Sequence, residues 1–151
     1  MNVVFCEEDV SDLWEEAESL TAAHWLELAH FKDIAFNPDK EAYRFLEQTD
    51  KLRCYTARSD GKLIGYQVFI VQPSLHYRQS LQAMDIGLYL DPEWRGKRIG
   101  LRSIKEADRR LAAQKVQVVY RHARRDSSTG KLLIRVGYDL ADEVYVKRLD
   151  I

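Results

Sequence analysis

A short stretch in the second half of the chain constrains its fold more than any other. It is the apolar strand-like run ending Leu88-Tyr89-Leu90, followed by Asp91-Pro92-Glu93-Trp94, a basic turn with glycines and a helix start. Such an arrangement leaves several backbone N–H groups unpaired at a helix N-terminus, where the helix dipole also favours an anion. We therefore predict a phosphate cradle made by Arg95, Gly96, Lys97, Arg98, Ile99 and Gly100.

The spacing within this turn excludes two common phosphate sites. It is neither the G-x-x-x-x-G-K-S/T of a P-loop nor the G-x-G-x-x-G of a dinucleotide fold. The turn instead resembles the central motif of the GNAT superfamily of N-acetyltransferases, Q/R-x-x-G-x-G/A, which follows a strand and binds the pyrophosphate of acetyl-CoA. Arg95 fills its first position, Gly100 its last, and Arg98 stands where the middle glycine is expected. A basic turn that merely caps a helix is the alternative, and it ranks lower.

The hydrophobic patterns along the chain predict strands mixed with helices. The hairpin at Ser59-Asp60-Gly61-Lys62 is the clearest local prediction, because Asp-Gly supplies the positive φ that a tight turn needs. The expected elements are a strand at 3–6, helices from 9 to about 34 and after Asn37-Pro38, strands at 52–58, 63–72 and 83–90, a helix from 99 to 111, a strand at 117–122, a helix from Asp126 or Ser127 to Gly137, and β structure over 138–149 interrupted near 141–143.

This order indicates an α/β fold in which helices cover a mixed sheet and a ligand lies at strand ends. It is also the GNAT order, and the resemblance extends over about residues 52–149. It implies a single GNAT-like domain over residues 1–151, with a central, mostly antiparallel sheet flanked by helices. The length of 151 residues and the 46% hydrophobic content are those of one domain with a full core.

Composition bears on the expected location of the protein and on its cysteine chemistry. No apolar stretch approaches the roughly 20 residues of a membrane-spanning helix, so we expect no membrane partner and a cytoplasmic location. The only cysteines are Cys6 and Cys54, without a C-x-x-C or a histidine at ligand spacing. Neither a disulfide framework nor a metal site is therefore predicted.

Charge is distributed unevenly along the chain. Residues 1–50 hold thirteen acidic and three basic residues, a net charge of −10, whereas residues 95–135 hold three acidic and thirteen basic residues, a net charge of +10. A basic segment can hold a polyanion such as CoA or nucleic acid, and an acidic one can attract a cationic amine or a protein. Two solvated faces are the alternative. Nucleic acid ranks behind CoA, because no recognised nucleic-acid motif or aromatic stacking platform is present.

The GNAT resemblance also implies roles for particular residues. The backbone N–H groups of Leu88 and Leu90 are expected to contact pantetheine and the thioester as an oxyanion hole. Asp85 is the leading candidate for the general base, followed by His76 and His122. Asp126 lies where the family often has an asparagine near the pantetheine arm, although capping a helix is the simpler explanation. The family's usual general acid, a tyrosine, is replaced by Leu133.

These features predict direct transfer of an acetyl group from acetyl-CoA to a primary amine of a protein or a small molecule. Acetyl-CoA serves as cosubstrate, no metal is expected, and the chain is a monomer or homodimer. Leu133 keeps open a GNAT-fold protein that has lost its chemistry and serves as a binding or virion component. A fainter similarity to small GNAT-like proteins encoded by tailed phages, carried by His76-Tyr77, the Asp85 to Pro92 strand and the Arg-Gly turn, would place the chain in a host cytoplasm. A nucleic-acid-binding module using residues 95–135 is the other alternative.

Overall fold

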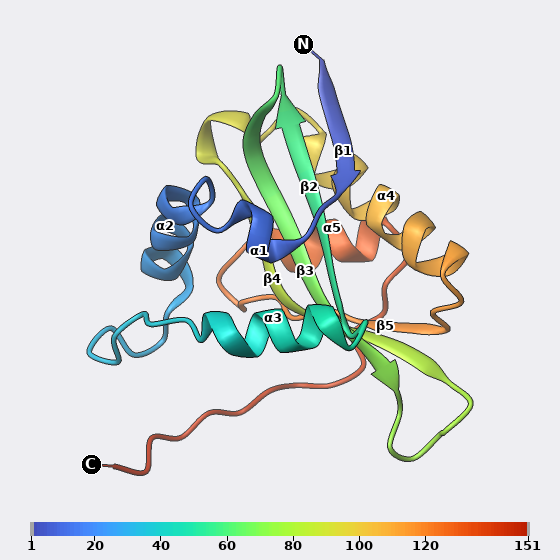
Figure 1. The fold of residues 1–151 in the computed structure, drawn as a ribbon. Helices are drawn as coiled ribbons and strands as arrows, with labels where there is room; N and C mark the ends of the chain where they lie inside the picture. The colour runs from blue at the N-terminus through green and yellow to red at the C-terminus, as the bar shows by residue number, and fades with distance from the viewer. Residues whose placement is uncertain (1, 151) are drawn as a thin grey trace.

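A twisted five-stranded sheet organises the computed structural model, which describes residues 2–150 (Figure 1). The strands lie in the order β1-β2-β3-β4-β5, antiparallel except for the parallel pair β4 and β5. Their bounds are β1 Val3–Glu7, β2 Leu52–Ser59, β3 Lys62–Pro73, β4 Leu81–Leu90 and β5 Val118–Tyr120. The predicted mixed, mostly antiparallel sheet is confirmed.

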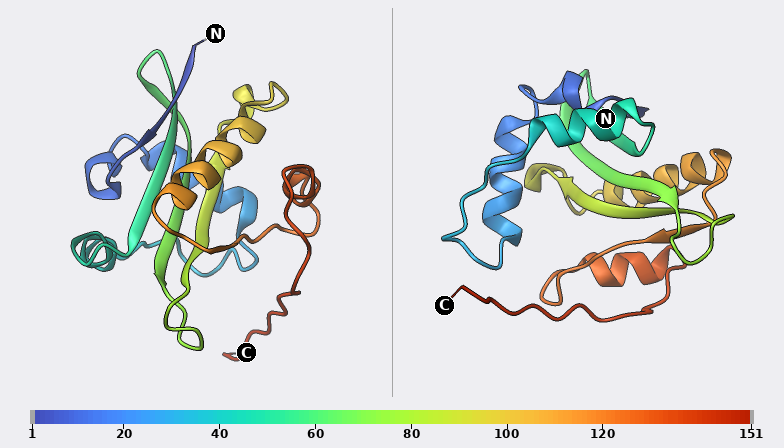
Figure 2. Two further views of the ribbon diagram at one scale, coloured as in Figure 1. Left: turned by 90° about the vertical axis from the view of Figure 1, so that its right-hand side faces the viewer. Right: turned by 60° about the horizontal axis from the view of Figure 1, so that its bottom comes forward.

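Helices cover both faces of the sheet (Figure 2). One face carries α1 Val10–Leu13, α2 Glu18–Leu28 and α3 Lys40–Gln48, and the other carries α4 Ile99–Ala113 and α5 Thr129–Arg135. We call these the α3 face and the α4 face. A short 3-10 helix, η1 Pro92–Trp94, connects β4 to the turn before α4. Among the described residues, no helix has the length and apolar character needed to cross a membrane.

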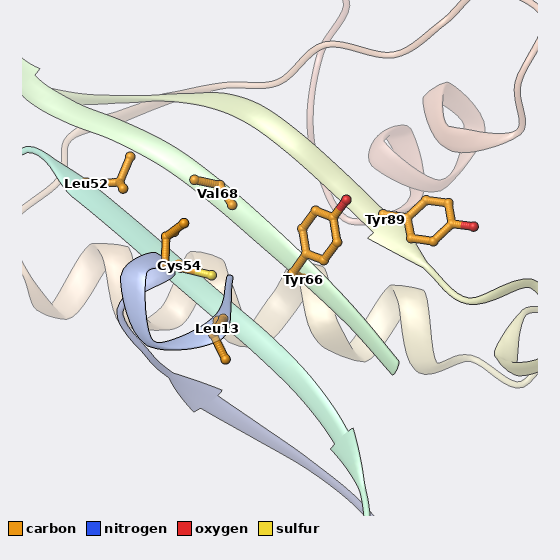
Figure 3. Close-up of a cluster of buried hydrophobic side chains, with 7 residues drawn as sticks. Leu13, Leu52, Cys54, Tyr66, Val68 and Tyr89 are labelled. Carbon is orange, nitrogen blue, oxygen red and sulfur yellow. The ribbon is translucent and has the colours of Figure 1, made fainter. Parts of the chain in front are cut away.

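The hydrophobic core is divided by the sheet into two layers. On the α3 face, Leu13, Leu52, Cys54, Tyr66, Val68 and Tyr89 form one buried cluster (Figure 3). On the α4 face, Phe69, Ala83 and Leu111 belong to a second cluster, beneath α4. Each long strand therefore buries side chains on both faces, which fixes the register of the central strands.

A tight turn before β3 and a β-bulge within β4 shape the strands around the site. Asp60 and Gly61, with φ of 48° and 82°, join β2 to β3 as the predicted hairpin. On β4, Val68 of β3 pairs with Gly87 and Phe69 pairs with Asp85, so Ile86 is an extra residue, a β-bulge. A bulge changes the direction of the local backbone and is common beside functional sites.

The predicted helix over residues 25–34 is wrong beyond Leu28. Ala29 is extended, and the chain crosses irregularly to α3. This brings the rings of Trp25 and Phe36 to a centroid distance of 6.5 Å, whereas a continuous helix would separate positions eleven apart by about 16 Å. Packing between these two aromatic residues therefore competes with local helical periodicity.

The predicted β structure over residues 138–149 is also wrong. Residues 138–150 form neither strand nor helix, and Leu140, Val144 and Tyr145 are exposed. The segment instead runs back beneath α3 toward the loop after α2, where Arg148 pairs with Asp33 at 2.7 Å (Figure 1). Strand propensity needs a neighbouring edge to become a strand, and this segment pairs with none of the described strands.

Candidate active site

The site is built around an open edge of β4. Strand β5 pairs with β4 only from Gln82 to Met84, so the second half of β4, from Asp85 onward, diverges from it. The backbone of Leu88 and Leu90 lies along this half, while the opposite edge of β4 stays paired with β3. The gap between the two strands begins at Asp85, next to the Ile86 bulge, and leads to the turn before α4.

The turn from Arg95 to Gly100 has the backbone of an anion cradle. Gly96 has φ of 78° with nothing within 4 Å of an added Cβ, so conformation rather than space calls for glycine there. Arg98, the N-cap of α4, has φ of 62° and so adopts the left-handed conformation that suits glycine, at a cost of about 1–2 kcal/mol. The first N–H groups of α4, at Ile99 and Gly100, have no partner within the helix.

Arg95, the first residue of this turn, contacts α2 and the end of β4. Its guanidinium makes a bidentate pair with Glu27 of α2 at 2.8 and 2.9 Å, its Nε donates to the Leu90 carbonyl at 2.9 Å, and it lies over the Tyr89 ring. The Glu27 contact is the main cause that raises the pKa of Arg95. Lys97 and Arg98 are both exposed, and the Lys97 ammonium lies over the Trp94 ring at 5.2 Å.

Asp85 and His122 meet where the strands diverge. The Asp85 carboxylate, 5% exposed, accepts the His122 backbone N–H at 3.0 Å and lies 3.0 Å from its ring Nδ1. Burial raises the pKa of Asp85, and the hydrogen bonds from His122 oppose that shift. The His122 side chain is 53% exposed. When Nδ1–H donates to Asp85, Nε2 can accept a proton from a ligand.

The other predicted site residues lie apart from this pair. His76 is exposed in the loop between β3 and β4, at the end of β4 opposite the Arg95–Gly100 turn. Asp126 is exposed and pairs with Arg124 at 2.9 Å, and the N-cap of α5 is Ser128 rather than Asp126. Leu133 is buried within α5.

Sequence reasoning missed a buried arginine beside Asp85. The Arg121 side chain is fully buried, stacks on Phe69 at 4.9 Å and donates to Gln67, Tyr138 and Asp108. Burial raises the pKa of Tyr138 to about 12. This network holds the end of β5 against α4, and it places His122, the next residue, at the gap. An arginine in a valine-rich strand was the only trace of it in the sequence.

Sequence reasoning also missed a pocket on the α3 face. It has a volume of about 350 Å³ and is lined by aromatic residues that include Trp14, Trp25, Phe36 and Tyr43. Its floor includes Ile86 and Gly87 of β4. The pocket therefore opens onto the same stretch of β4 as the gap, from the other face.

A second histidine lies in this pocket. His24 Nδ1 is 2.7 Å from the Tyr66 hydroxyl, and its ring stacks on Tyr89 with centroids 4.8 Å apart. An added Cβ on Gly87 would lie 3.8 Å from the His24 ring and 3.7 Å from the Tyr66 ring. Burial lowers the pKa of His24, which favours the neutral imidazole. In the sequence, a lone histidine on an acidic helix gave no indication that His24 would contact Tyr66 and Tyr89.

Comparisons with known proteins agree with the geometry. Residues 12–130 match the family described as Acetyltransferase (GNAT) family. No curated protein matches the chain in sequence.

Solved structures share the fold over nearly the whole chain. A ribosomal-protein-alanine N-acetyltransferase from Brucella melitensis biovar Abortus 2308 is 22% identical, with 98% of this chain and 99% of that one covered and a TM-score of 0.73. An aminoglycoside acetyltransferase from an uncultured soil metagenomic sample, in complex with sisomicin, is 18% identical, with 99% and 95% covered and a TM-score of 0.73. A predicted acetyltransferase from Clostridium acetobutylicum, with acetyl-CoA, is 14% identical, with 97% and 96% covered and a TM-score of 0.70.

Proposed function

We propose that this chain, which belongs to the acetyltransferase (GNAT) family and is an acyltransferase of that type, transfers the acetyl group of acetyl-CoA directly to a primary amine. The observation that carries the proposal is the open half of β4. It begins at the Asp85 and His122 pair and ends at the anion cradle of Arg95 to Gly100. This half strand spans about 17 Å, which suits an extended pantetheine arm between a pyrophosphate and a thioester.

The residues of the chain divide the work of binding along this edge. The pyrophosphate is held by the N–H groups at the start of α4 and by the charges of Lys97 and Arg98. The pantetheine arm lies along Leu88 and Leu90, and backbone N–H groups near the bulge stabilise the negative charge that develops on the thioester oxygen. The family's use of acetyl-CoA supplies the donor, and these residues orient it.

Asp85 and His122 are proposed to manage the proton. The amine nitrogen attacks the thioester carbon, a C–N bond forms, and His122 Nε2 accepts the proton that the nitrogen loses. Asp85 fixes the imidazole orientation and stabilises the imidazolium. The C–S bond then breaks, and the CoA thiolate takes its proton from the imidazolium or from water. This route needs no tyrosine at position 133.

Neither cysteine serves as a covalent carrier in this mechanism. Cys54 is buried on β2, and burial raises the pKa of its thiol to about 12, which suppresses the reactive thiolate. Cys6 lies on β1, at the opposite edge of the sheet from β5. Direct attack by the amine is therefore favoured over an acetyl-enzyme intermediate.

A GNAT-fold binding protein without chemistry is the second candidate, and the buried Leu133 favours it. The test is calorimetry with acetyl-CoA, combined with detection of released CoA thiol in the presence of amines. We expect binding below millimolar concentration, weakened at least about tenfold by Gly100→Glu, because a carboxylate would enter the cradle. The control is Gly130→Ala in α5, where an added Cβ would make only an ordinary contact, 3.9 Å from the Ala123 Cβ. Binding without transfer to any amine between pH 6 and 9 would favour the second candidate, and no binding would refute both.

A further inference from the structure

The pocket on the α3 face has an unusual lining for an enzyme that acts on amines. Among the described residues that line it there is no aspartate, glutamate, lysine or arginine, and most are aromatic or aliphatic. A polycationic acceptor needs carboxylates to replace its lost hydration, since burying an unpaired charge is costly. This pocket offers such an acceptor none.

Eight of the thirteen acidic residues in the first fifty positions are engaged away from this pocket. Six of their carboxylates line a separate, shallow hollow between β1, α1 and the end of α3: Glu7, Glu8, Asp9, Asp12, Glu47 and Asp50. Glu16 pairs with Arg58, and Glu27 pairs with Arg95. The net charge of −10 therefore gives no reason to expect a cationic acceptor at β4.

Two lysines add positive charge on the aromatic wall. Lys32 lies over the Trp25 ring at 5.3 Å, and Lys40 lies over the Trp14 ring at 5.4 Å. Both tryptophans line the pocket, so each offers one ring face to a lysine. A multiply charged cation would meet like charge here, whereas an apolar molecule would gain aromatic contact.

One polar group of the pocket lies at β4. There the His24 ring and the Tyr66 hydroxyl, 2.7 Å apart, face Gly87. When the neutral imidazole carries its proton on Nδ1, the Tyr66 hydroxyl oxygen accepts the His24 Nδ1–H. In that tautomer His24 Nε2 is an acceptor suited to the N–H of an amine.

We propose that the acceptor is a primary amine on an apolar, aromatic skeleton, with its ring between Trp14, Trp25 and Phe36 and its nitrogen toward Gly87 and His24. This inference rests on the proposed acetyl transfer. The pocket is assigned as the acceptor site because its lining includes Ile86 and Gly87, at the bulge of β4. The volume of about 350 Å³ falls within the range of about 300–1,000 Å³ typical of small-molecule sites.

The test is an acceptor series on the unaltered chain with saturating acetyl-CoA: ethylamine, hexylamine, 2-phenylethylamine, spermidine and sisomicin. We expect kcat/KM for 2-phenylethylamine to exceed that for ethylamine by about 10- to 100-fold, since a buried ring contributes that much. Spermidine and sisomicin should be poorer than 2-phenylethylamine. A flat series, or preference for a polycation, would overturn the inference.

A pair of phenylalanines provides matched variants. Phe36→Ala should lower the ratio of kcat/KM between 2-phenylethylamine and ethylamine by about tenfold, since it removes one wall of the pocket. Phe45→Ala, an equally drastic truncation of an exposed ring on α3, should leave that ratio unchanged. Both rings are about half exposed, so neither truncation hollows the core. Equal ratios in the two variants would contradict the assigned pocket.

A binding measurement separates this inference from the proposed function. Trp14 and Trp25 line the pocket, so 2-phenylethylamine should change tryptophan fluorescence saturably whether or not transfer occurs, and Phe36→Ala should weaken that change. If ethylamine is acetylated without aromatic preference, the acceptor class is wrong and the transferase stands. If no amine is acetylated but 2-phenylethylamine binds, the transferase fails and the pocket stands. Absence of saturable binding overturns the pocket.

Discussion

Two histidines flank β4, and they lie in opposite settings. His122 is half exposed at the gap on the β5 side, where a buried carboxylate holds it. His24 is packed in the apolar pocket on the α3 face, where a tyrosine hydroxyl holds it and Tyr89 covers its ring. His122 therefore has a carboxylate within hydrogen-bond distance, whereas burial beside a neutral hydroxyl disfavours a charged imidazole at His24.

This difference separates two tasks that one histidine would perform poorly. A proton acceptor must become charged during the reaction, which suits His122 with Asp85 behind it. A group that orients an apolar acceptor should remain neutral, which suits His24. The Ile86 bulge lies between them, so donor and acceptor can approach the same stretch of β4 from different sides. Variants at each pair test whether the tasks are divided in this way.

The largest effect is expected for Asp85→Asn. It should lower kcat about 100-fold while the acetyl-CoA dissociation constant changes little, since the interaction matters most when His122 becomes charged. Rapid quench of acetyl transfer and calorimetry measure the two quantities. Asp126→Asn, on an exposed carboxylate paired with Arg124, is the matched control. An unimpaired Asp85→Asn variant would remove this pair from the mechanism.

A smaller and different effect is expected for His24→Gln. KM for 2-phenylethylamine should rise about tenfold, the equivalent of one hydrogen bond, with a much smaller change in kcat. His30→Gln, at the exposed histidine after the same helix, is the control. Steady-state kinetics at saturating acetyl-CoA gives both constants. If kcat falls 100-fold here and not in Asp85→Asn, the proton acceptor lies on the α3 face and the comparison is reversed.

Glu27 connects the acceptor pocket with the phosphate turn, because its carboxylate on α2 accepts two hydrogen bonds from the Arg95 guanidinium. Glu27→Gln should weaken the hold on α2 and raise KM for the acceptor by up to about fivefold, as expected for a half-exposed ion pair. The same change frees the positive charge of Arg95 and should tighten acetyl-CoA binding, most clearly at low salt. Glu18→Gln in the first turn of α2 should do neither. Parallel changes in both affinities would refute this coupling.

The parts of the site that the sequence could predict are those set by local backbone chemistry. The Asp60-Gly61 hairpin and the strand, turn and helix at Leu88 to Gly100 follow from glycine positions and apolar runs, and both are present. The turn even keeps its left-handed residue although Arg98 replaces glycine. Asp85 and His122 were both candidates, but their contact depends on the divergence of β4 and β5, which no local pattern encodes.

The parts that sequence reasoning missed depend on contacts between distant segments. His24 and Tyr66 are 42 positions apart, and the pocket forms only because the helix ends at Leu28 and the chain turns back. Arg121 is buried because α4 and Tyr138 supply its partners. The net charge of residues 1–50 was misleading for a related reason, since folding places six of their carboxylates in a hollow beside β1, at another edge of the sheet.

The smallest effects, and the sharpest contrast between the two pairs, are expected in the pH dependence of stability. Burial raises the pKa of Asp85 above 3.8 in the folded chain, so the folded state binds more protons than the unfolded state. The contribution of Asp85 to stability is therefore lost as pH rises through its folded pKa. Burial lowers the pKa of His24 below 6.5, so the unfolded state binds more protons and stability is lost as pH falls below about 6.5. Glu27, which raises the His24 pKa, and Arg95, which lowers it, face His24 but do not outweigh burial.

The midpoint of thermal unfolding should therefore respond in opposite directions in the two variants. The midpoint of Asp85→Asn, expressed as its difference from that of the unaltered chain, should increase as pH rises above about 4. The corresponding difference for His24→Gln should increase as pH falls below about 6.5. Differential scanning calorimetry between pH 4.5 and 8 measures both slopes. Slopes of the same sign would mean that the pKa of Asp85 or of His24 is not shifted in the direction that burial implies. The proposed division of tasks across β4 would then fail.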